Sequence, residues 1–165
     1  LKTGRPTSDP DQAFVEAGQF VAPTLVTGGS TPLGQAMDLA LDTLTARKNF
    51  YKTNGIPYNR PWIFLISDGA PDRGWESAAD RSSQEVAGNH AIVWSIGVDG
   101  ANLQTLSRFS GDRPAFPLKG LYFSELFEFI SNSVSGASTT DPSNPTFEIK
   151  LEDLAKWAQI PLSNG

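Results

Sequence analysis

The chain has 165 residues and a formal net charge of -5, a length that suits one ordinary domain with a tail. Its acidic balance, without any basic run, argues against nucleic acid as a partner, and its lack of cysteine excludes disulfides, thiolate metal sites and cysteine nucleophiles. No apolar run approaches the roughly 20 residues that cross a bilayer, so we expect a cytoplasmic protein without a membrane partner.

The first 26 residues show no clear helical or strand period. We interpret residues 1–10 as an irregular leader, because glycine, proline and short polar residues interrupt every pattern there. Residues 11–26 predict short extended pieces. The folded domain is therefore expected to begin near residue 11.

A long helix is predicted over residues 32–53. Its apolar side chains recur at spacings of three and four residues and form one stripe, while polar residues fall elsewhere. Thr31 offers a hydroxyl N-cap, and Pro32 is a proline at or near the first helical position. Asn54-Gly55 supplies a left-handed stop.

Two apolar runs, over residues 61–67 and 91–98, predict buried strands. Neither run alternates apolar and polar residues, which is typical of parallel strands covered on both faces. Each run ends at an aspartate followed by a glycine, Asp68 in the first and Asp99 in the second. A helix over residues 75–86 is predicted between them.

The remaining pattern gives a short helix over residues 102–110, a short strand over 114–118 and a closing helix over 123–134. Strands that alternate with helices imply βαβ units with right-handed crossovers. The predicted fold class is therefore α/β, with a mainly parallel sheet.

Residues 136–165 are predicted to form a linker and a tail. The stretch 136–145 is rich in serine, threonine, proline and asparagine, which is typical of a linker or exposed loop. Beyond it, residues 147–149 could add an edge strand, and residues 151–158 carry a short amphipathic helical pattern.

Candidate metal ligands stand at the ends of the predicted elements. Thr31 lies at a helix start and Asp68 just past a strand, positions that open onto the same edge of a parallel sheet, where Asp72 and Asp99 could join them. A hydroxyl with carboxylates suits a hard divalent cation such as Mg²⁺. Each residue also has a simpler interpretation: Thr31 as an N-cap, Asp68 as a turn former, and the other two as solvated turn acids.

An enzyme receives little support from the sequence. His90 is the only histidine and precedes a strand in a predicted surface turn, and nucleophile-elbow, Walker and dinucleotide fingerprints are all missing. Trp62 and Trp94 lie inside the apolar strand runs, so we interpret them as core residues. Trp75 follows the Asp68 loop closely, so we treat it as a candidate for partner contact.

Four stretches carry a resemblance to a known family. They are residues 29–34, Gly-Ser-Thr-Pro-Leu-Gly before a long helix, residues 54–71, which include the first strand and Asp68, and the shorter stretches 94–98 and 117–121. They resemble the bacterial von Willebrand factor type A (VWA) domains of the TerY-like or YegL-like, tellurium-resistance-associated group. The likeness defines a VWA-like domain over residues 11–135 and implies a Rossmann-like, doubly wound sheet flanked by helices.

Such domains carry a metal-ion-dependent adhesion site (MIDAS), built from an Asp-x-Ser-x-Ser loop, a threonine from a second loop and an aspartate from a third. The resemblance assigns the threonine to Thr31 and the aspartate to Asp68. We add Ser30, Ser67, Asp72 and Trp75 as candidates for residues that lie beside these ligands or contact a partner.

The resemblance implies a protein-interaction module rather than an enzyme. In the family, Mg²⁺, or Mn²⁺ or Ca²⁺ in its place, leaves a coordination position for an acidic group of a partner protein. The implied setting is a bacterial stress or tellurium-resistance-like system. The alternative is a metal-independent scaffold with a degenerate site, which docks in a larger assembly through its surface or its tail.

One part of the family pattern is missing. Asp-x-Ser-x-Ser occurs nowhere in the chain, and the family's early strands and first helix would precede Gln12. The first strand would lie in the middle of the sheet, so its neighbours would otherwise expose apolar surface and unpaired backbone. Residues outside the given sequence, a separate chain or a rebuilt, degenerate site would each explain this; we favour the first and expect the motif upstream in the source gene.

Overall fold

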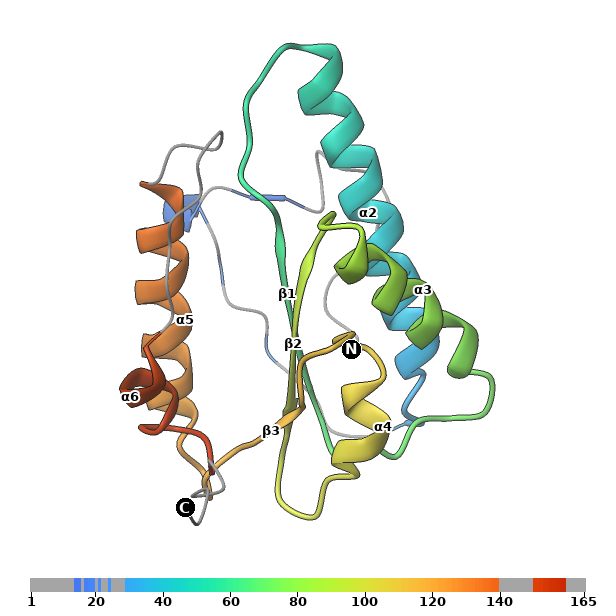
Figure 1. Cartoon of the computed structure of the whole chain (residues 1–165), viewed down its shortest axis with the longest axis vertical. Coiled ribbons are helices and arrows are strands. Elements are labelled where there is room, and N and C mark those ends of the chain that lie inside the picture. The colour runs from blue at the N-terminus through green and yellow to red at the C-terminus, as the bar shows by residue number, and fades with distance from the viewer. Residues whose placement is uncertain are drawn as a thin grey trace. The chain divides into compact units, whose positions relative to one another are not determined.

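Three parallel strands form one sheet, in the order β1-β2-β3, in the computed structural model (Figure 1). The strands are β1 (Trp62–Ser67), β2 (Ile92–Gly97) and β3 (Phe116–Pro117). In the register of the first pair, Ser67 lies opposite Gly97, so β1 and β2 end at the same level. The prediction of an α/β fold with a parallel sheet is confirmed.

The structure describes residues 14–15, 17–19, 21, 24, 29–139 and 150–159. The leader predicted at 1–10 and the edge strand suggested at 147–149 lie outside these residues, as does much of 11–26. Where residues 11–26 are described, Ala17–Gln19 form a 3-10 helix, so the prediction of extended structure is wrong there. Short 3-10 turns are common as connectors, and this stretch has no alternating pattern that would favour a strand instead.

The helices occupy the regions that the sequence predicts, except that the last long helix continues to Ser138, three residues into the stretch predicted to be a linker or exposed loop. Their bounds are α2 (Leu33–Thr53), α3 (Glu76–Ala87), α4 (Leu103–Ser107), α5 (Phe123–Ser138) and α6 (Leu151–Leu154). None of the described helices combines the length and the apolar character that a membrane span requires.

The chain divides into two compact units. The helix unit consists of Leu1–Pro57 and Pro71–Ser82, and it contains α2 and the first part of α3. The sheet unit consists of Tyr58–Ala70 and Ser83–Gly165, and it contains all three strands together with α4, α5 and α6.

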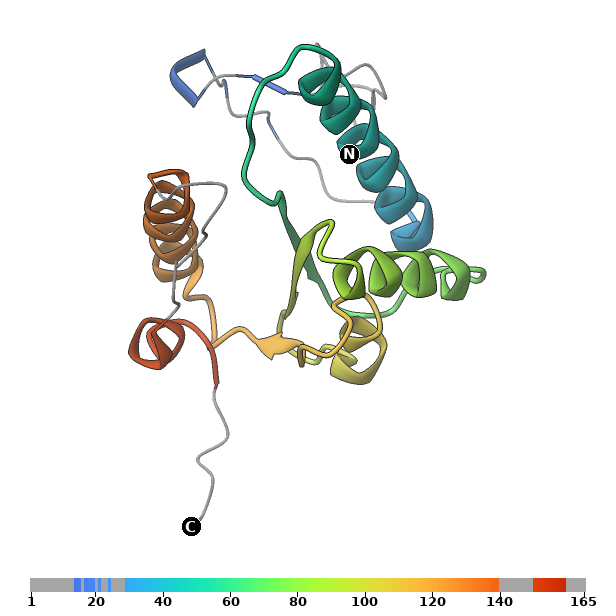
Figure 2. The ribbon, with the colours of Figure 1, turned by 45° about the horizontal axis from the view of Figure 1, so that its top comes forward.

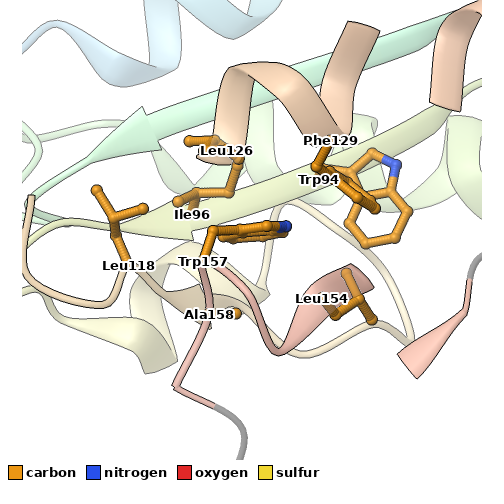
Figure 3. Packing of buried hydrophobic residues seen from close by; sticks show 8 residues of the cluster. All are labelled: Trp94, Ile96, Leu118, Leu126, Phe129, Leu154, Trp157 and Ala158. Carbon is orange, nitrogen blue, oxygen red and sulfur yellow. The ribbon is translucent and has the colours of Figure 1, made fainter. Parts of the chain in front are cut away.

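The core of the sheet unit lies between the sheet and the helices α5 and α6 (Figure 3). Successive side chains of a strand point to opposite faces, so Trp94 and Ile96 of β2 share the face that α5 and α6 cover, while α4 packs on the other face (Figure 2). The buried cluster consists of Trp94, Ile96, Leu118, Leu126, Phe129, Leu154, Trp157 and Ala158.

Residues 150–159 are part of this core. Trp157 is fully buried, and its ring centroid lies 5.3 Å from that of Phe129. Its carbonyl oxygen accepts a hydrogen bond of 2.7 Å from the amide of Lys119, and the amide of Gln159 donates one of 2.9 Å to the carbonyl of Pro117. These bonds make an antiparallel bridge beside β3.

The two long strands differ in burial. Five of the six residues of β2 are buried, whereas all six of β1 are only half-buried. The prediction of a strand covered on both faces is therefore confirmed for β2 and wrong for β1. The reason is position, because β2 lies between two strands and β1 has one strand neighbour among the described residues.

In the helix unit, α2 presents the apolar stripe that its spacing predicts. Leu33, Met37 and Leu41 are buried.

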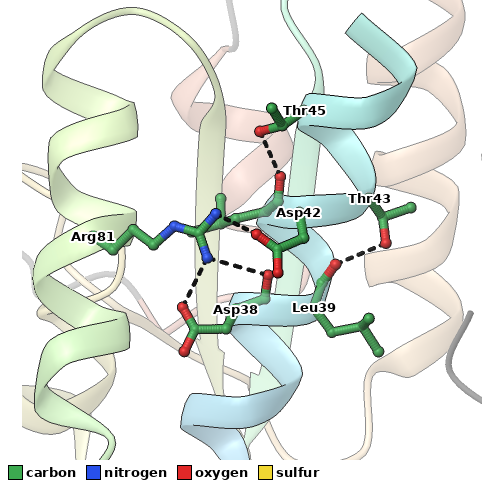
Figure 4. A network of polar contacts seen from close by, with 7 residues as sticks. Asp38, Leu39, Asp42, Thr43, Thr45 and Arg81 are labelled. Atoms are coloured by element: carbon green, nitrogen blue, oxygen red, sulfur yellow. Dashed lines mark hydrogen bonds and ion pairs between the residues drawn. The ribbon is translucent and has the colours of Figure 1, made fainter. Parts of the chain in front are cut away.

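On another side of α2, Arg81 of α3 forms ion pairs with Asp38 at 3.0 Å and with Asp42 at 2.6 Å (Figure 4). These hydrogen bonds, that of Asp42 above all, raise the pKa of Arg81. One guanidinium thus bridges two like charges one helical turn apart and reduces their mutual repulsion.

Replacing Arg81 by methionine is expected to lower the free energy of unfolding by less than about 1 kcal/mol, because all three side chains are partly exposed. Urea denaturation measures the change. In the Arg81→Met background, Asp42→Asn should then stabilise the protein, since it removes the uncompensated repulsion with Asp38. A further loss in that double variant would contradict the charge-based account.

Candidate metal site

Asp68 lies just beyond the carboxyl end of β1, as the sequence predicts, and it is exposed. Its carboxylate oxygen Oδ1 accepts a hydrogen bond of 3.1 Å from the amide of Ala70 and a weaker one of 3.4 Å from the hydroxyl of Ser67. Asp68 is therefore a turn former, because an Asx turn joins a side chain to the backbone two residues on. Its other oxygen, Oδ2, has no hydrogen bond among the described residues.

The backbone around Asp68 is fixed by hydrogen bonds inside the sheet unit. The amide of Asn102 donates a hydrogen bond of 2.9 Å to the carbonyl of Asp68. The amide of Val98 donates one of 3.1 Å to the carbonyl of Ser67. Gly69 is buried with a φ of 69°, and a Cβ there would lie 2.6 Å from the carbonyl oxygen of Asn102. Only glycine fits this combination of conformation and close approach.

Asn102 is a residue whose role the sequence did not reveal. Its amide holds the Asp68 loop, and its side-chain Oδ1 accepts from the amide of Thr105 at 3.1 Å, which caps α4. An asparagine before a short helix signals an N-cap. The bond to Asp68 uses the backbone, which any residue carries, so the sequence has no signal for it.

In the helix unit, Thr31 pairs with Asp72. The amide of Thr31 donates to Oδ1 of Asp72 at 3.3 Å, and its carbonyl accepts from the amide of Asp72 at 2.9 Å. Asp72 is thus more than a solvated turn acid, since it fixes the loop before α2. The hydroxyl of Thr31 has no hydrogen-bond partner among the residues that the structure describes.

The interpretation of Thr31 as the N-cap of α2 is wrong. Pro32 occupies the N-cap position, and no side chain caps the helix there. The cause is the pairing with Asp72, which holds the Thr31 backbone one residue outside the helix. The hydroxyl of Thr31 therefore has no capping role in α2.

The other candidates are distributed over both units. In the helix unit, Ser30 is exposed and Trp75 is half-buried. The backbone of Trp75 packs closely against Gly34, because a Cβ on Gly34 would lie 2.9 Å from the Cα of Trp75. In the sheet unit, Asp99 is exposed beyond the end of β2, at the same edge as Asp68. Asp99 therefore fits its interpretation as a solvated turn acid.

The remaining sequence interpretations concern histidine and tryptophan. His90 is exposed beside Glu85, which confirms a surface turn. Trp94 is in the core, as predicted, whereas Trp62 is only half-buried at the start of β1. Among the described residues, no group of three or more histidine, aspartate or glutamate side chains is placed to hold a metal ion together.

Comparison with known proteins gives no further assignment. No protein-family model, curated protein or solved structure matches the chain.

Proposed function

We propose that this chain is a protein-interaction module that binds an acidic group of a partner protein through a divalent cation. The Asp68 carboxylate and the Thr31 hydroxyl are two of the ion's ligands. The observation that carries the proposal is the exposed carboxylate of Asp68, held by a fixed loop beyond the end of β1. Ligands of open parallel sheets bind outside this edge.

Thr31 contributes a second oxygen. Within the helix unit, the backbone of Thr31 is held by its two hydrogen bonds with Asp72. Hydroxyl and carboxylate oxygens suit Mg²⁺, which keeps several waters and prefers few protein ligands. The VWA resemblance supports the same two roles, and in that family the remaining ligands come from water, the partner's acid and an Asp-x-Ser-x-Ser loop.

Titration of the full-length protein with Mg²⁺ and Mn²⁺ by calorimetry tests the proposal. The wild type should bind, and Asp68→Asn should weaken binding roughly tenfold or more, because it removes the ligand charge. Thr31→Val should also weaken binding, while Thr31→Ser, which keeps the hydroxyl, should restore it. Asp112→Asn is the matched control, since Asp112 is an exposed acid in the loop before β3.

The proposal is overturned if the full-length protein binds neither ion, or if Asp68→Asn binds as tightly as the wild type. Chelation separates it from the metal-independent scaffold. A partner that binds equally well in EDTA and to Asp68→Asn would establish the scaffold instead. Deletion of the tail is a poor discriminator, because Trp157 is part of the core and the deletion would damage the fold.

A further inference from the structure

A small pocket lies at the opposite, amino edge of the sheet, inside the sheet unit. It has a volume of about 230 Å³ between the start of β1 and the last turns of α5. Its apolar wall includes Trp62, Phe64, Val134 and Ala137, and Arg60 stands in its lining. This volume is below the roughly 300–1,000 Å³ of pockets for drug-sized ligands, so it suits one ring or one branched hydrocarbon group.

One edge of the pocket is built by a bond between distant parts of the chain. The side-chain amide of Asn59 donates to the carbonyl of Ala137 at 3.1 Å, which ties the segment before β1 to the end of α5. Val134 is 45% exposed although it is apolar, so this side of α5 continues the apolar wall toward solvent. The pocket is thus open to a ligand from outside.

The charge at this edge is positive, and no acid in the described part of the chain pairs with it. Arg60 donates to the neutral side chain of Asn89 at 2.6 Å and forms no ion pair with a described acid. Arg113, in the loop before β3, has a buried Nη1 without a hydrogen-bond partner in the described part of the chain, and its guanidinium lies 5.7 Å from the ring of Trp94. Burial first, and the charge of Arg60 second, lower the pKa of Arg113.

We infer that this pocket binds an apolar carboxylate, with the hydrocarbon group against Trp62 and Val134 and the carboxylate on Arg60. A neutral apolar group would leave Arg60 without an anion, and a small inorganic anion would leave the apolar wall exposed to water. A planar guanidinium pairs with a carboxylate through two parallel hydrogen bonds. A free small acid and the terminal residue of a peptide both offer this chemistry.

Calorimetry or ligand-observed NMR with 3-phenylpropanoate tests the inference, on the full-length protein in EDTA so that no metal site contributes. The neutral amide, 3-phenylpropanamide, and acetate should each bind roughly tenfold more weakly or worse, because each lacks one half of the ligand. A tripeptide that ends in phenylalanine, with a free or an amidated terminus, compares the two sources. Tighter binding of the free-acid peptide than of phenylpropanoate assigns the peptide terminus, and the reverse assigns the small acid.

Substitutions test whether phenylpropanoate binds in this pocket. Arg60→Gln should weaken phenylpropanoate binding roughly tenfold, and its fold should be unaffected because Arg60 is exposed. Lys119→Gln is the matched control, since it removes the same charge from an exposed residue beyond β3. Equal binding of acid and amide, equal binding by Arg60→Gln and the wild type, or no binding at about 10 mM would overturn the inference. None of these outcomes bears on the Asp68 site.

Discussion

Replacing Trp157 by alanine lowers the free energy of unfolding by about 3–5 kcal/mol, which makes it the most damaging single substitution that we expect. The side chain is fully buried, and its ring contacts Phe116 and Phe129 at centroid distances of 6.0 and 5.3 Å. Removing it leaves a cavity between α5 and the segment that follows α6. Urea denaturation followed by circular dichroism measures the loss.

Phe127→Ala is the matched control for this prediction. Phe127 is an aromatic residue on α5, but it is 56% exposed, so its truncation should cost less than about 1 kcal/mol. A Trp157 variant as stable as the Phe127 variant would mean that residues 150–159 are not part of the core.

The Gly69→Ala substitution is the second large effect, and it acts on the loop that holds Asp68. A residue with a side chain at a φ of 69° costs about 1–2 kcal/mol. A Cβ that close to the backbone of Asn102 adds about 1–3 kcal/mol, because neither backbone can move freely. Thermal denaturation should show the loss, and calorimetry should show weaker binding of Mn²⁺ by the full-length protein.

Gly100→Ala separates the two contributions. Gly100 has a φ of 75°, yet a Cβ there would have no neighbour within 4 Å. Its substitution should therefore cost the conformational strain alone and leave Mn²⁺ binding intact. If both glycine variants lose the same stability, the close approach to Asn102 is not what fixes the Asp68 loop.

Local patterns predicted the elements well, because the signals of helices and strands are local. The spacing of Leu33, Met37 and Leu41 gives α2 and its buried side, and two uninterrupted apolar runs give β1 and β2. The position of Asp68 follows from the end of such a run. The same patterns carry no information on the order of the strands in the sheet. The sequence therefore predicts equal burial for β1 and β2, although β2 is more buried than β1.

Contacts between distant segments were not predictable. Trp157 follows a polar linker and a short amphipathic pattern, which together indicate a tail, and its burial depends on α5. Thr31 looked like an N-cap, but a residue 41 positions away holds its backbone. The pocket at the amino edge combines Arg60 with Val134, whose sequence neighbourhoods give no hint of one another.

The antiparallel bridge beside β3 has a consequence for biosynthesis. Leu118 can meet Ala158 only after the ribosome has made the chain through that residue, and domains emerge from their amino-terminal end. Until then, Phe129 lacks its ring contact with Trp157, and the core cluster that also contains Trp94 is incomplete. A nascent or stalled chain that ends before Trp157 would expose an apolar, aggregation-prone face of the sheet unit and become a substrate for chaperones or proteases.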